Sequence, residues 1–517
     1  MTAPPGSGGR PVRGARAANA TAARISQLSP EKRALLERQL LERRAAASTD
    51  APIPRRPAGV RPPLSYPQQR LWFLDQLSPG DAKYNACLSF ELDGPVDVER
   101  LRRAFTALVG RHEALRTVFR TDAGVPYQHV LDEHDIPLPV LDLRHLSEPE
   151  RTARLAEVTR DAPREPYDLA NDLMLRLLLV RLDDVRSVLL LMEHHIAFDG
   201  WSDEILCDEV SALYVLDEPR PDSLPELPVQ YADFSQWQRE RLDGPRMEAG
   251  TAFWAAQLAG APAHLDLPLD HARPPLQTFD GRRCYFTVEA ADAERLLAGG
   301  RAQGATPFMT LLATFGVLLH RWSGETDIVV GTPIANRSRV EVERLIGFFS
   351  NTMALRVRPH SDASFTDLVR AVRDTALAAY EHQDIPFERV VEAVAPVRDP
   401  ARNPLFQVNF RVVGDDPPLL RLPGVECRNV PVDVGFSRFD LAMELQLTGG
   451  RIEGYLEYNV ALLTEATARA LTRTFVGVAA ALGTTPDVPL GRAAGPDLTE
   501  EDAPTAIRGR RRARTST

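Results

Sequence analysis

The sequence predicts a mixed α/β fold built from two halves of similar design. Amphipathic helical segments alternate with short aliphatic runs along most of the 517 residues, and the second half repeats the style of the first. With 44% hydrophobic and 26% charged residues, the chain can bury ordinary cores, and its length suits more than one structural unit. We therefore expect an α/β (α+β, two-layer) pseudo-dimer of two halves, each of about 200 residues.

The two ends of the chain differ in composition from the body. Residues 1–24 are rich in Ala, Gly, Pro and Arg, and 28–47 has the pattern of a short helix with Ser29 as N-cap. A proline-rich stretch at 51–63 follows. We expect residues 1–63 to be a disordered arm or linker with a helix near 29–47, and residues 491–517, with a basic run at 508–514, to be a disordered tail.

The first half is expected to span residues 64–228. Helical periodicity marks 98–115 and 201–216, and the apolar runs 173–182 and 187–195 predict buried strands. The proline-rich segment 219–228 predicts a crossover to the second half.

The second half is expected to span residues 229–490. Its periodicity predicts the following helices and strands. The helices are expected at 290–304, 306–322, 364–382 and 463–483, and the strands near 327–334, 350–357, 404–412, 437–447 and 451–458.

Composition excludes several function classes. The net charge of −10 argues against nucleic-acid binding, which needs concentrated Lys and Arg. No apolar run reaches the roughly 20 residues of a membrane helix, and the N-terminus lacks the apolar core of an export signal. The four cysteines, at 87, 207, 284 and 427, show no metal-ligand spacing. We expect a cytoplasmic, metal-free monomer.

The segment EHHIAFDGWS at 193–202 is the candidate site. His194 and His195 end a predicted buried strand, and because strand neighbours point to opposite faces, only one of them can face a cleft. Neutral imidazole can accept a proton from an attacking amine or hydroxyl, Asp199 can fix the loop, and Gly200 leaves room for a ligand. The residues alone leave two structural alternatives open, a satisfied core histidine and a simple Asp-Gly turn.

HHIAFDG at 194–200 matches the HHxxxDG signature of the condensation domains of nonribosomal peptide synthetases, and the other motifs of that family follow in order. They are LSYPQQRLWFLDQL at 64–77, RHEALRTVF at 111–119, YADFSQWQ at 231–238, IGFFSNTMALR at 346–356, HQDIPFERVV at 382–391 and RDPARNPLFQV at 398–408. The chain therefore resembles this family over about 64–490.

The resemblance implies two lobes like chloramphenicol acetyltransferase, in a V around a central tunnel. It also implies an acyl donor carried as a thioester on the 4'-phosphopantetheine arm of a carrier protein, with no permanently bound cofactor. The acceptor is a small-molecule or carrier-bound amine or alcohol, so the product is an amide or an ester. By the same resemblance His195 is the catalytic residue and acts without a covalent enzyme intermediate.

The resemblance also assigns supporting roles. His194, Asp199, Gly200 and Arg337 are expected to be structural, with Asp199 and Arg337 forming a bidentate pair; a surface charge is the alternative for Arg337. The tunnel-proximal residues are expected to be Trp201, Ser350 and Asn351, with core packing as the alternative for Trp201. Arg70, Arg116 and Asp384 are expected to make scaffold hydrogen bonds.

Two positions depart from the family pattern. Ser350 stands where Val is common, and Glu193 stands where an apolar or neutral residue is usual. If Glu193 shares the face of His195, as strand alternation suggests, its carboxylate raises the imidazole pKa.

Within these residues we find no adenylation loop, carrier-protein serine motif or thioesterase elbow. We therefore expect a free-standing condensation enzyme that receives activated substrates, with the helix at 28–47 as a possible docking element. The alternatives are a coenzyme A-dependent acyltransferase and a non-catalytic recruiting domain. The segment VGFSRFDL at 434–441, where plant-type acyltransferases carry DFGWG, disfavours the first, and the intact histidine pair disfavours the second.

Overall fold

The computed structural model describes residues 51–492 except 58, 133–134 and 415–417. The helix expected at 28–47 and the tail from 493 onward lie outside the described residues. The chain divides into two units between Ile53 and Pro54, and the architecture below is that of the second unit.

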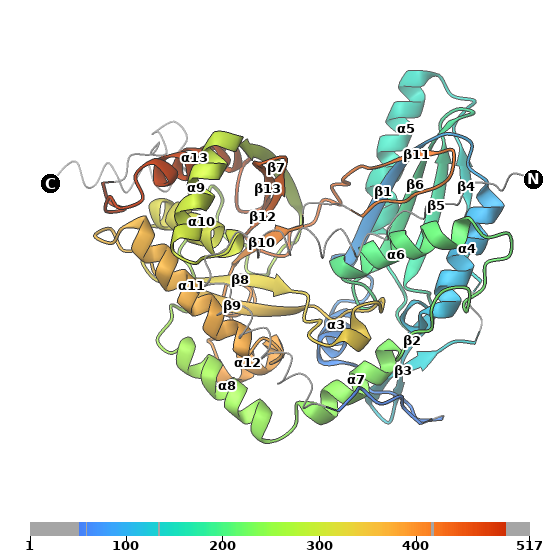
Figure 1. Ribbon diagram of the computed structural model, residues 1–517, viewed down its shortest axis with the longest axis horizontal. Helices are drawn as coiled ribbons and strands as arrows, with labels where there is room; N and C mark the ends of the chain where they lie inside the picture. Colours follow the sequence, from blue (N-terminus) through green and yellow to red (C-terminus); the bar gives the residue numbers. More distant parts are fainter. Residues whose placement is uncertain (1–50, 58, 133–134, 415–417, 493–517) are drawn as a thin grey trace, which may run out of the picture. The chain divides into compact units, whose positions relative to one another are not determined.

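The first sheet has five strands in the order β11-β1-β6-β5-β4 (Figure 1). Strand β6 pairs antiparallel with both β1 and β5, and β4 pairs parallel with β5. One face packs on helices α4 and α6, and the other packs on α5. The elements are β1 (Asn85–Asp93), α4 (Val98–Arg111), β4 (Val140–Asp142), α5 (Glu148–Asp161), β5 (Leu175–Arg181), β6 (Arg186–His194), α6 (Gly200–Tyr214) and β11 (Glu426–Asn429).

The second sheet has six strands in the order β7-β13-β12-β10-β8-β9. Strand β10 runs parallel to β12 and β8, and the other pairs are antiparallel. Helices α9, α10, α11 and α13 cover one face (Figure 1). The elements are β7 (Gly281–Val288), α9 (Ala290–Ala302), α10 (Pro307–Ser323), β8 (Ile328–Ile334), β9 (Asn351–Val357), α11 (Phe365–Glu381), β10 (Val408–Val413), β12 (Leu441–Thr448), β13 (Arg451–Asn459) and α13 (Glu465–Thr484).

All helices and strands predicted between 98 and 484 are present, with bounds within a few residues of those expected. Others have no counterpart among the predictions, because they are short or weakly periodic. They are α3 (Tyr66–Leu77), β2 (Thr117–Asp122), β3 (Val125–Val130), α7 (Tyr231–Arg241), α8 (Pro245–Gln257) and α12 (Phe387–Val394), together with β1, β4, β7, β11 and α5.

The first sheet contains strands from both sides of residue 228, the expected boundary between the halves. Strand β11, from the second half of the sequence, pairs antiparallel with β1, so that Phe90 lies opposite Asn429 and Asp93 opposite Glu426. In Figure 1 the orange β11 belongs to the same sheet as the blue β1, and it forms the edge of that sheet. The long connection between β10 and β12 therefore completes a sheet built by residues 85–194.

Ordered contacts with the body begin before Leu64, where the sequence predicts the folded part to start. Arg56 forms ion pairs with Asp233 at 2.7 Å and Glu113 at 2.8 Å. Pro63 bridges to Tyr127 of β3. The proline-rich composition of this stretch indicates an extended backbone, and the extended chain is held by charge and by backbone bonds instead of secondary structure.

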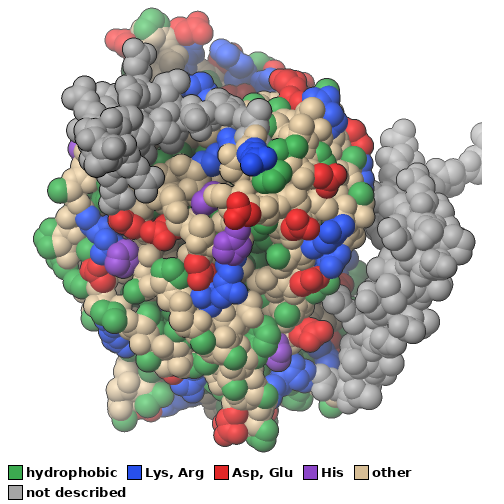
Figure 2. All heavy atoms as spheres, turned by 90° about the vertical axis from the view of Figure 1, so that its left-hand side faces the viewer, with side chains coloured by type: hydrophobic (Ala, Val, Ile, Leu, Met, Phe, Trp, Pro, Cys, Tyr) green, Lys and Arg blue, Asp and Glu red, His purple; other side chains and the backbone are tan. Residues whose placement is uncertain are grey.

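Within the described ranges, no single helix is long and apolar enough to cross a bilayer. Helices α9 and α10 together have the length and apolar composition of a membrane span, but a bend of 109° separates them. Helix α10 is also buried in the core of the second half. On the face shown in Figure 2, blue basic and red acidic side chains are interspersed.

Candidate active site

The site loop is a turn between β6 and α6. Strand β6 ends at His194, and α6 begins at Gly200 with Asp199 as its N-cap. The Asp199 carboxylate accepts hydrogen bonds from the Ser202 N–H at 3.0 Å and from the Ser202 hydroxyl at 2.8 Å. Asp is favoured at this position because its carboxylate satisfies amide groups that have no partner within the helix.

The alternation of β6 sends the two residues before His195 to opposite faces. Leu189 and Leu191 pack in the core beneath α4 and α6, whereas Leu190 and Met192 pack in the core beneath α5. The His194 ring therefore lies on the α5 side, edge-on to Tyr167 with ring centroids 5.7 Å apart. Its Nδ1 accepts a hydrogen bond from the Ile196 N–H at 3.2 Å, which fits the expected structural role.

His195 lies one residue beyond the strand and is half-buried. Its backbone N–H donates to the Tyr84 carbonyl at 2.9 Å. Its ring Nδ1 lies 3.3 Å from the Phe198 carbonyl oxygen, and because a carbonyl only accepts, Nδ1 carries the proton. In this tautomer Nε2 keeps its lone pair and can accept a proton.

Burial lowers the pKa of His195 to about 3, and the positive charge of Arg438 adds to the effect. The imidazole is therefore neutral at physiological pH. The expectation that Glu193 raises this pKa is wrong. Glu193 shares the face of Leu189 and Leu191 under α6, whereas the chain turns at His195.

The Asp199 carboxylate also joins the site loop to the second half of the sequence. It lies 2.9 Å from Nη2 of Arg337, both side chains being only 2% exposed, and it accepts from the Phe349 N–H at 3.0 Å. The pairing predicted between these residues is present, but it is not bidentate. The other guanidinium nitrogen, Nη1, donates to the carbonyls of Val342 and Leu345 instead.

A close approach of two chain segments fixes the wall beside His195. The Tyr231 hydroxyl donates to the Phe348 carbonyl at 2.6 Å and lies 2.8 Å from the Ser65 hydroxyl, which must then donate to it. A Cβ at Gly347 would lie 2.1 Å from the Tyr231 ring, so only glycine allows this approach. The contact holds the Phe348 ring 6.2 Å from the His195 ring.

The residues expected near a tunnel have mostly bracing contacts. Trp201 is 45% exposed, so the core-packing alternative is wrong, and its indole N–H donates to the Glu343 carbonyl. Asn351 donates to the carbonyls of Gln383 and Ile385 and accepts from the Phe387 N–H, which occupies its amide within the fold. The Ser350 hydroxyl lies 3.5 Å from Asp199, at the limit of a hydrogen bond.

Other expected residues lie around this frame. Gly200 is exposed, and nothing lies within 4 Å of the position that a Cβ would occupy. Arg70 pairs with Glu388 at 3.6 Å, Arg116 donates to a backbone carbonyl, and Asp384 accepts from Arg246. Among the residues that the structure describes, no cluster of His, Cys, Asp and Glu suits a metal ion.

The structure gives Glu193 a different partner from the one expected, and it adds two arginines near His195 that the sequence did not single out. Glu193 is buried and hydrogen-bonds the side chain of Asp203 on α6; burial and this neighbour raise its pKa well above the ordinary value. Arg438 and Arg411 act on the electrostatics of His195 from the second half of the chain. No local motif marks these arginines, because only the packing of the two halves brings them to the loop.

Comparison with known proteins supports a family assignment. The family model described as Condensation domain matches residues 61–502. Phosphinothricin tripeptide synthetase PhsC of Streptomyces viridochromogenes is 44% identical over 447 residues, covering 86% of this chain and 41% of that protein. Chondramide synthase cmdD of Chondromyces crocatus is 37% identical over 432 residues, covering 83% of this chain and 11% of that protein. The chain thus spans well under half the length of these relatives.

Solved structures give the same fold. The X-domain from teicoplanin biosynthesis aligns with a TM-score of 0.77 and 27% identity, covering 86% of this chain and 100% of that chain. The SgcC5 protein from Streptomyces globisporus aligns with a TM-score of 0.69 and 28% identity, covering 83% and 100%. The fold predicted from the sequence, an α/β fold of the chloramphenicol acetyltransferase type, is confirmed.

Proposed function

The chain belongs to the condensation domain family of nonribosomal peptide synthesis, and on that premise we propose that it is an acyltransferase with His195 as its catalytic residue. The donor is an acyl or aminoacyl group held as a thioester on the 4'-phosphopantetheine arm of a carrier protein. The acceptor is an amine, which gives an amide, or a hydroxyl, which gives an ester.

The observation that carries this proposal is the fixed tautomer of His195. With the Nδ1 proton directed at the Phe198 carbonyl, Nε2 can accept a hydrogen bond from the N–H or O–H of the nucleophile. The nucleophile attacks the thioester carbonyl, a C–N or C–O bond forms, and the C–S bond breaks. The proton lost by the nucleophile passes through Nε2 to the departing thiolate, so the enzyme is unchanged at the end.

The low pKa of His195 gives the imidazole a specific part in this step. A group with a pKa of about 3 is a weak base, so it does not hold a proton between turnovers. Its main contribution is then to align the nucleophile and to accept a hydrogen bond that strengthens as positive charge develops on the attacking atom.

The carrier arm needs an approach to His195 that side chains do not block. Gly200, with open space where a Cβ would be, lies beside the site loop and supports such an approach. We propose that substrates reach the site already activated as thioesters, and that the purified chain accepts a carrier protein added as a separate molecule.

The test is to incubate the purified chain with an aminoacyl-loaded carrier protein and a panel of amines and alcohols, and to identify products by mass spectrometry. We expect an amide or ester with the parent protein, and a loss of rate of about 10²- to 10⁴-fold with His195→Ala. His271→Ala, which removes an exposed histidine elsewhere in the chain, is the matched control and should retain the parent rate.

The same panel separates the alternatives. Equal turnover of acyl coenzyme A without a carrier would identify a coenzyme A-dependent acyltransferase instead. If no acyl donor is consumed and His195→Ala behaves as the parent, a non-catalytic recruiting role replaces the proposal.

A further inference from the structure

The face of the six-stranded sheet opposite its helices carries a charged stripe. Along β12 the alternation is regular, with Leu441, Met443 and Leu445 buried in the helical core and Glu444 pointing to the other face. Arg411 on β10 lies opposite Glu444 and pairs with it. The register continues the stripe to Tyr455, whose hydroxyl donates to Glu444.

A second ion pair extends this stripe. Arg283 on β7 lies opposite Glu457 on β13, and their charged groups are 3.2 Å apart. Each acid of the stripe therefore has its own arginine, and the paired charges are balanced.

Arg438 is a further arginine, and it takes no part in the ion pairs of this stripe. Among the described residues no carboxylate lies at ion-pair distance from its guanidinium, and its Cζ lies 5.9 Å from the centroid of the Tyr84 ring. Glu457 acts on it only as a more distant charge, and Arg411 and Arg70 oppose it. The guanidinium donors are therefore left for water or for a ligand.

The position of Arg438 is fixed by the backbone. Its carbonyl accepts hydrogen bonds from the Asn403 side chain at 2.7 Å and the Gln277 side chain at 3.1 Å. The Tyr84 ring beneath its guanidinium belongs to the residue whose carbonyl accepts the His195 N–H. One chain of contacts thus joins Arg438 to the catalytic histidine through Tyr84.

Arg438 is also reachable from solvent. The residue is exposed, so its guanidinium is accessible to water or to a ligand. Arg411 is exposed as well, and the charges of Arg438 and Arg411 both lower the pKa of the half-buried His195. Together with the contact through Tyr84, this places the charge of Arg438 near the His195 imidazole.

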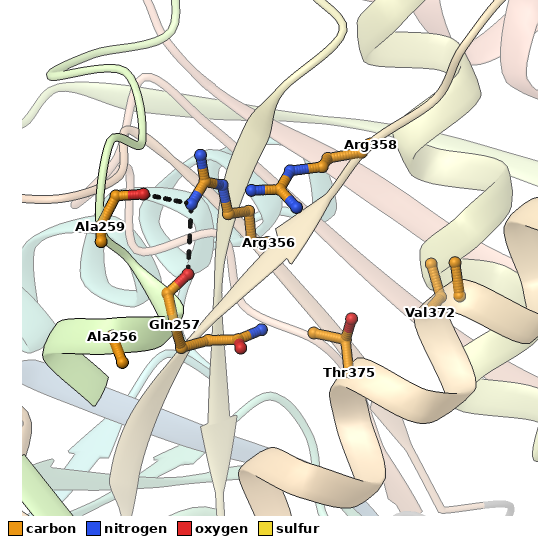
Figure 3. Close-up of a pocket in the computed structure, with 8 residues that line it drawn as sticks. Ala256, Gln257, Ala259, Arg356, Arg358, Val372 and Thr375 are labelled. Atoms are coloured by element: carbon orange, nitrogen blue, oxygen red, sulfur yellow. Dashed lines mark hydrogen bonds between the residues drawn. The ribbon is translucent and has the colours of Figure 1, made fainter. Parts of the chain in front are cut away.

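Another arginine pocket shows what a structural arginine looks like in this protein. In the pocket of about 280 Å³ in Figure 3, Arg356 donates to the carbonyls of Gln257 and Ala259, and it pairs with Asp327 at 2.6 Å. All three nitrogen atoms of that guanidinium donate hydrogen bonds within the protein. Within the part of the chain that the structure describes, the guanidinium of Arg438 has no such set of partners.

We propose that Arg438 binds an anionic group, a carboxylate, of the substrate that reacts beside His195. The inference rests on the function proposed above and adds the chemical class of the substrate. A planar guanidinium matches a carboxylate through two parallel N–H···O bonds, which would fix the nucleophile or the acyl group relative to Nε2 of His195. Such a carboxylate belongs either to the acceptor or to the acyl chain of the donor.

The experiment compares acids with their amides, which match in size but in which one carboxylate is replaced by an uncharged amide. Acceptors are glycine, alanine and glutamate against glycinamide, alaninamide and glutamine; donors are succinyl- against succinamoyl-N-acetylcysteamine. For each pair kcat/KM is measured by mass spectrometry, and affinity is measured by calorimetry without turnover. We expect the parent to prefer the acid of at least one pair, and Arg438→Gln to lose about 10- to 100-fold on that acid while its amide is unaffected.

The variants separate binding from folding. Arg438→Lys keeps the positive charge but cannot form two parallel N–H···O bonds. It should therefore retain part of the preference for the acid over its amide. Arg428→Gln removes an exposed arginine that pairs with Glu91, roughly 20 Å along β1 from the His194 end, and should change nothing.

The pair that responds to Arg438→Gln identifies the source of the carboxylate, acceptor or donor. Equal loss on acid and amide, or no preference for any acid in either turnover or calorimetry, overturns the inference. A parent without turnover whose calorimetry still favours acids would contradict the proposed function while leaving the anion site supported.

Discussion

At the scale of single residues, the chemistry depends on where the chain leaves strand β6. His194 still obeys strand alternation and is held on the α5 side, where it packs on Tyr167. His195 follows the last strand residue and is free to turn its ring, which the Phe198 carbonyl then orients. The catalytic role proposed for His195, the second histidine, depends on this difference of one position.

Glu193 gives the first prediction at this scale. Burial, with Asp203 beside it, raises the pKa of Glu193, and burial raises the pKa of Asp203 to about 7. The folded state therefore holds protons that the unfolded state releases near pH 4, so stability falls as the pH rises from about 4 through about 7. In Glu193→Gln an uncharged amide can donate to Asp203, which removes much of this dependence.

The measurement is urea unfolding of both proteins between pH 5 and pH 8. The stability of Glu193→Gln relative to the parent should improve with pH, by roughly 1–3 kcal/mol, because the parent must bury an ionised carboxylate at the upper end. If the free energies of unfolding of the two proteins change with pH in parallel, Glu193 does not hold a proton in the folded state.

At the scale of elements, strand β11 is the least expected feature. Its four residues, Glu426–Asn429, add an edge to a sheet formed by a distant part of the sequence. Leu420, Leu422 and Val425, which lead into it, are buried in the core of the first half. Four residues are too few for a hydrophobic period to predict a strand. The buried residues that precede β11 hold the chain beside β1, and this determines where β11 pairs.

Val430→Pro tests this crossing strand. The Val430 N–H donates to the Ser89 carbonyl at 2.9 Å, and proline has no N–H to donate. Because Ser89 is buried, its carbonyl would lose a partner without gaining water, so we expect a loss of about 1–3 kcal/mol in the free energy of unfolding.

The matched control is Val430→Ala, which shortens the side chain and keeps the N–H. Circular dichroism during urea denaturation should show the proline variant unfolding first. Coincident curves for the two variants would show that β11 adds no stability.

At the scale of the whole molecule, a buried charged junction joins the two halves of the sequence at the site loop. Asp199 comes from the loop before α6, and Arg337 and Phe349 come from the second half of the sequence. The Gly347 N–H donates to the Ser202 hydroxyl at 3.1 Å, which adds a further bond across this junction. The active-site loop is therefore held in shape by residues that belong to the other half.

Arg337→Ala tests this junction. It leaves the buried Asp199 carboxylate without its counter-charge and frees two carbonyls, so we expect a loss of about 3 kcal/mol or more in unfolding free energy. The measurement is urea unfolding followed by tryptophan fluorescence. Arg344→Ala, which changes an exposed arginine in the neighbouring segment, should stay within about 0.5 kcal/mol of the parent, and an equally mild Arg337→Ala would refute the junction's role.

The sequence by itself determined the fold class, most helices and central strands, and the site loop. These features depend on interactions within a few residues: helical period in α4 and α10, apolar runs in β5 and β6, and an Asp N-cap that follows two histidines. Each of these patterns is formed by residues close together in the sequence and does not depend on the rest of the chain.

Only the tertiary structure decided which strand completes the first sheet, that Asp199 meets Arg337 through one oxygen, and that Glu193 faces Asp203 instead of His195. It also decided that Arg438, which forms no ion pair with any described residue, lies next to Tyr84. These outcomes depend on register and on the packing of segments far apart in the sequence, where charge balance and burial are set by both halves together, and no local pattern encodes them.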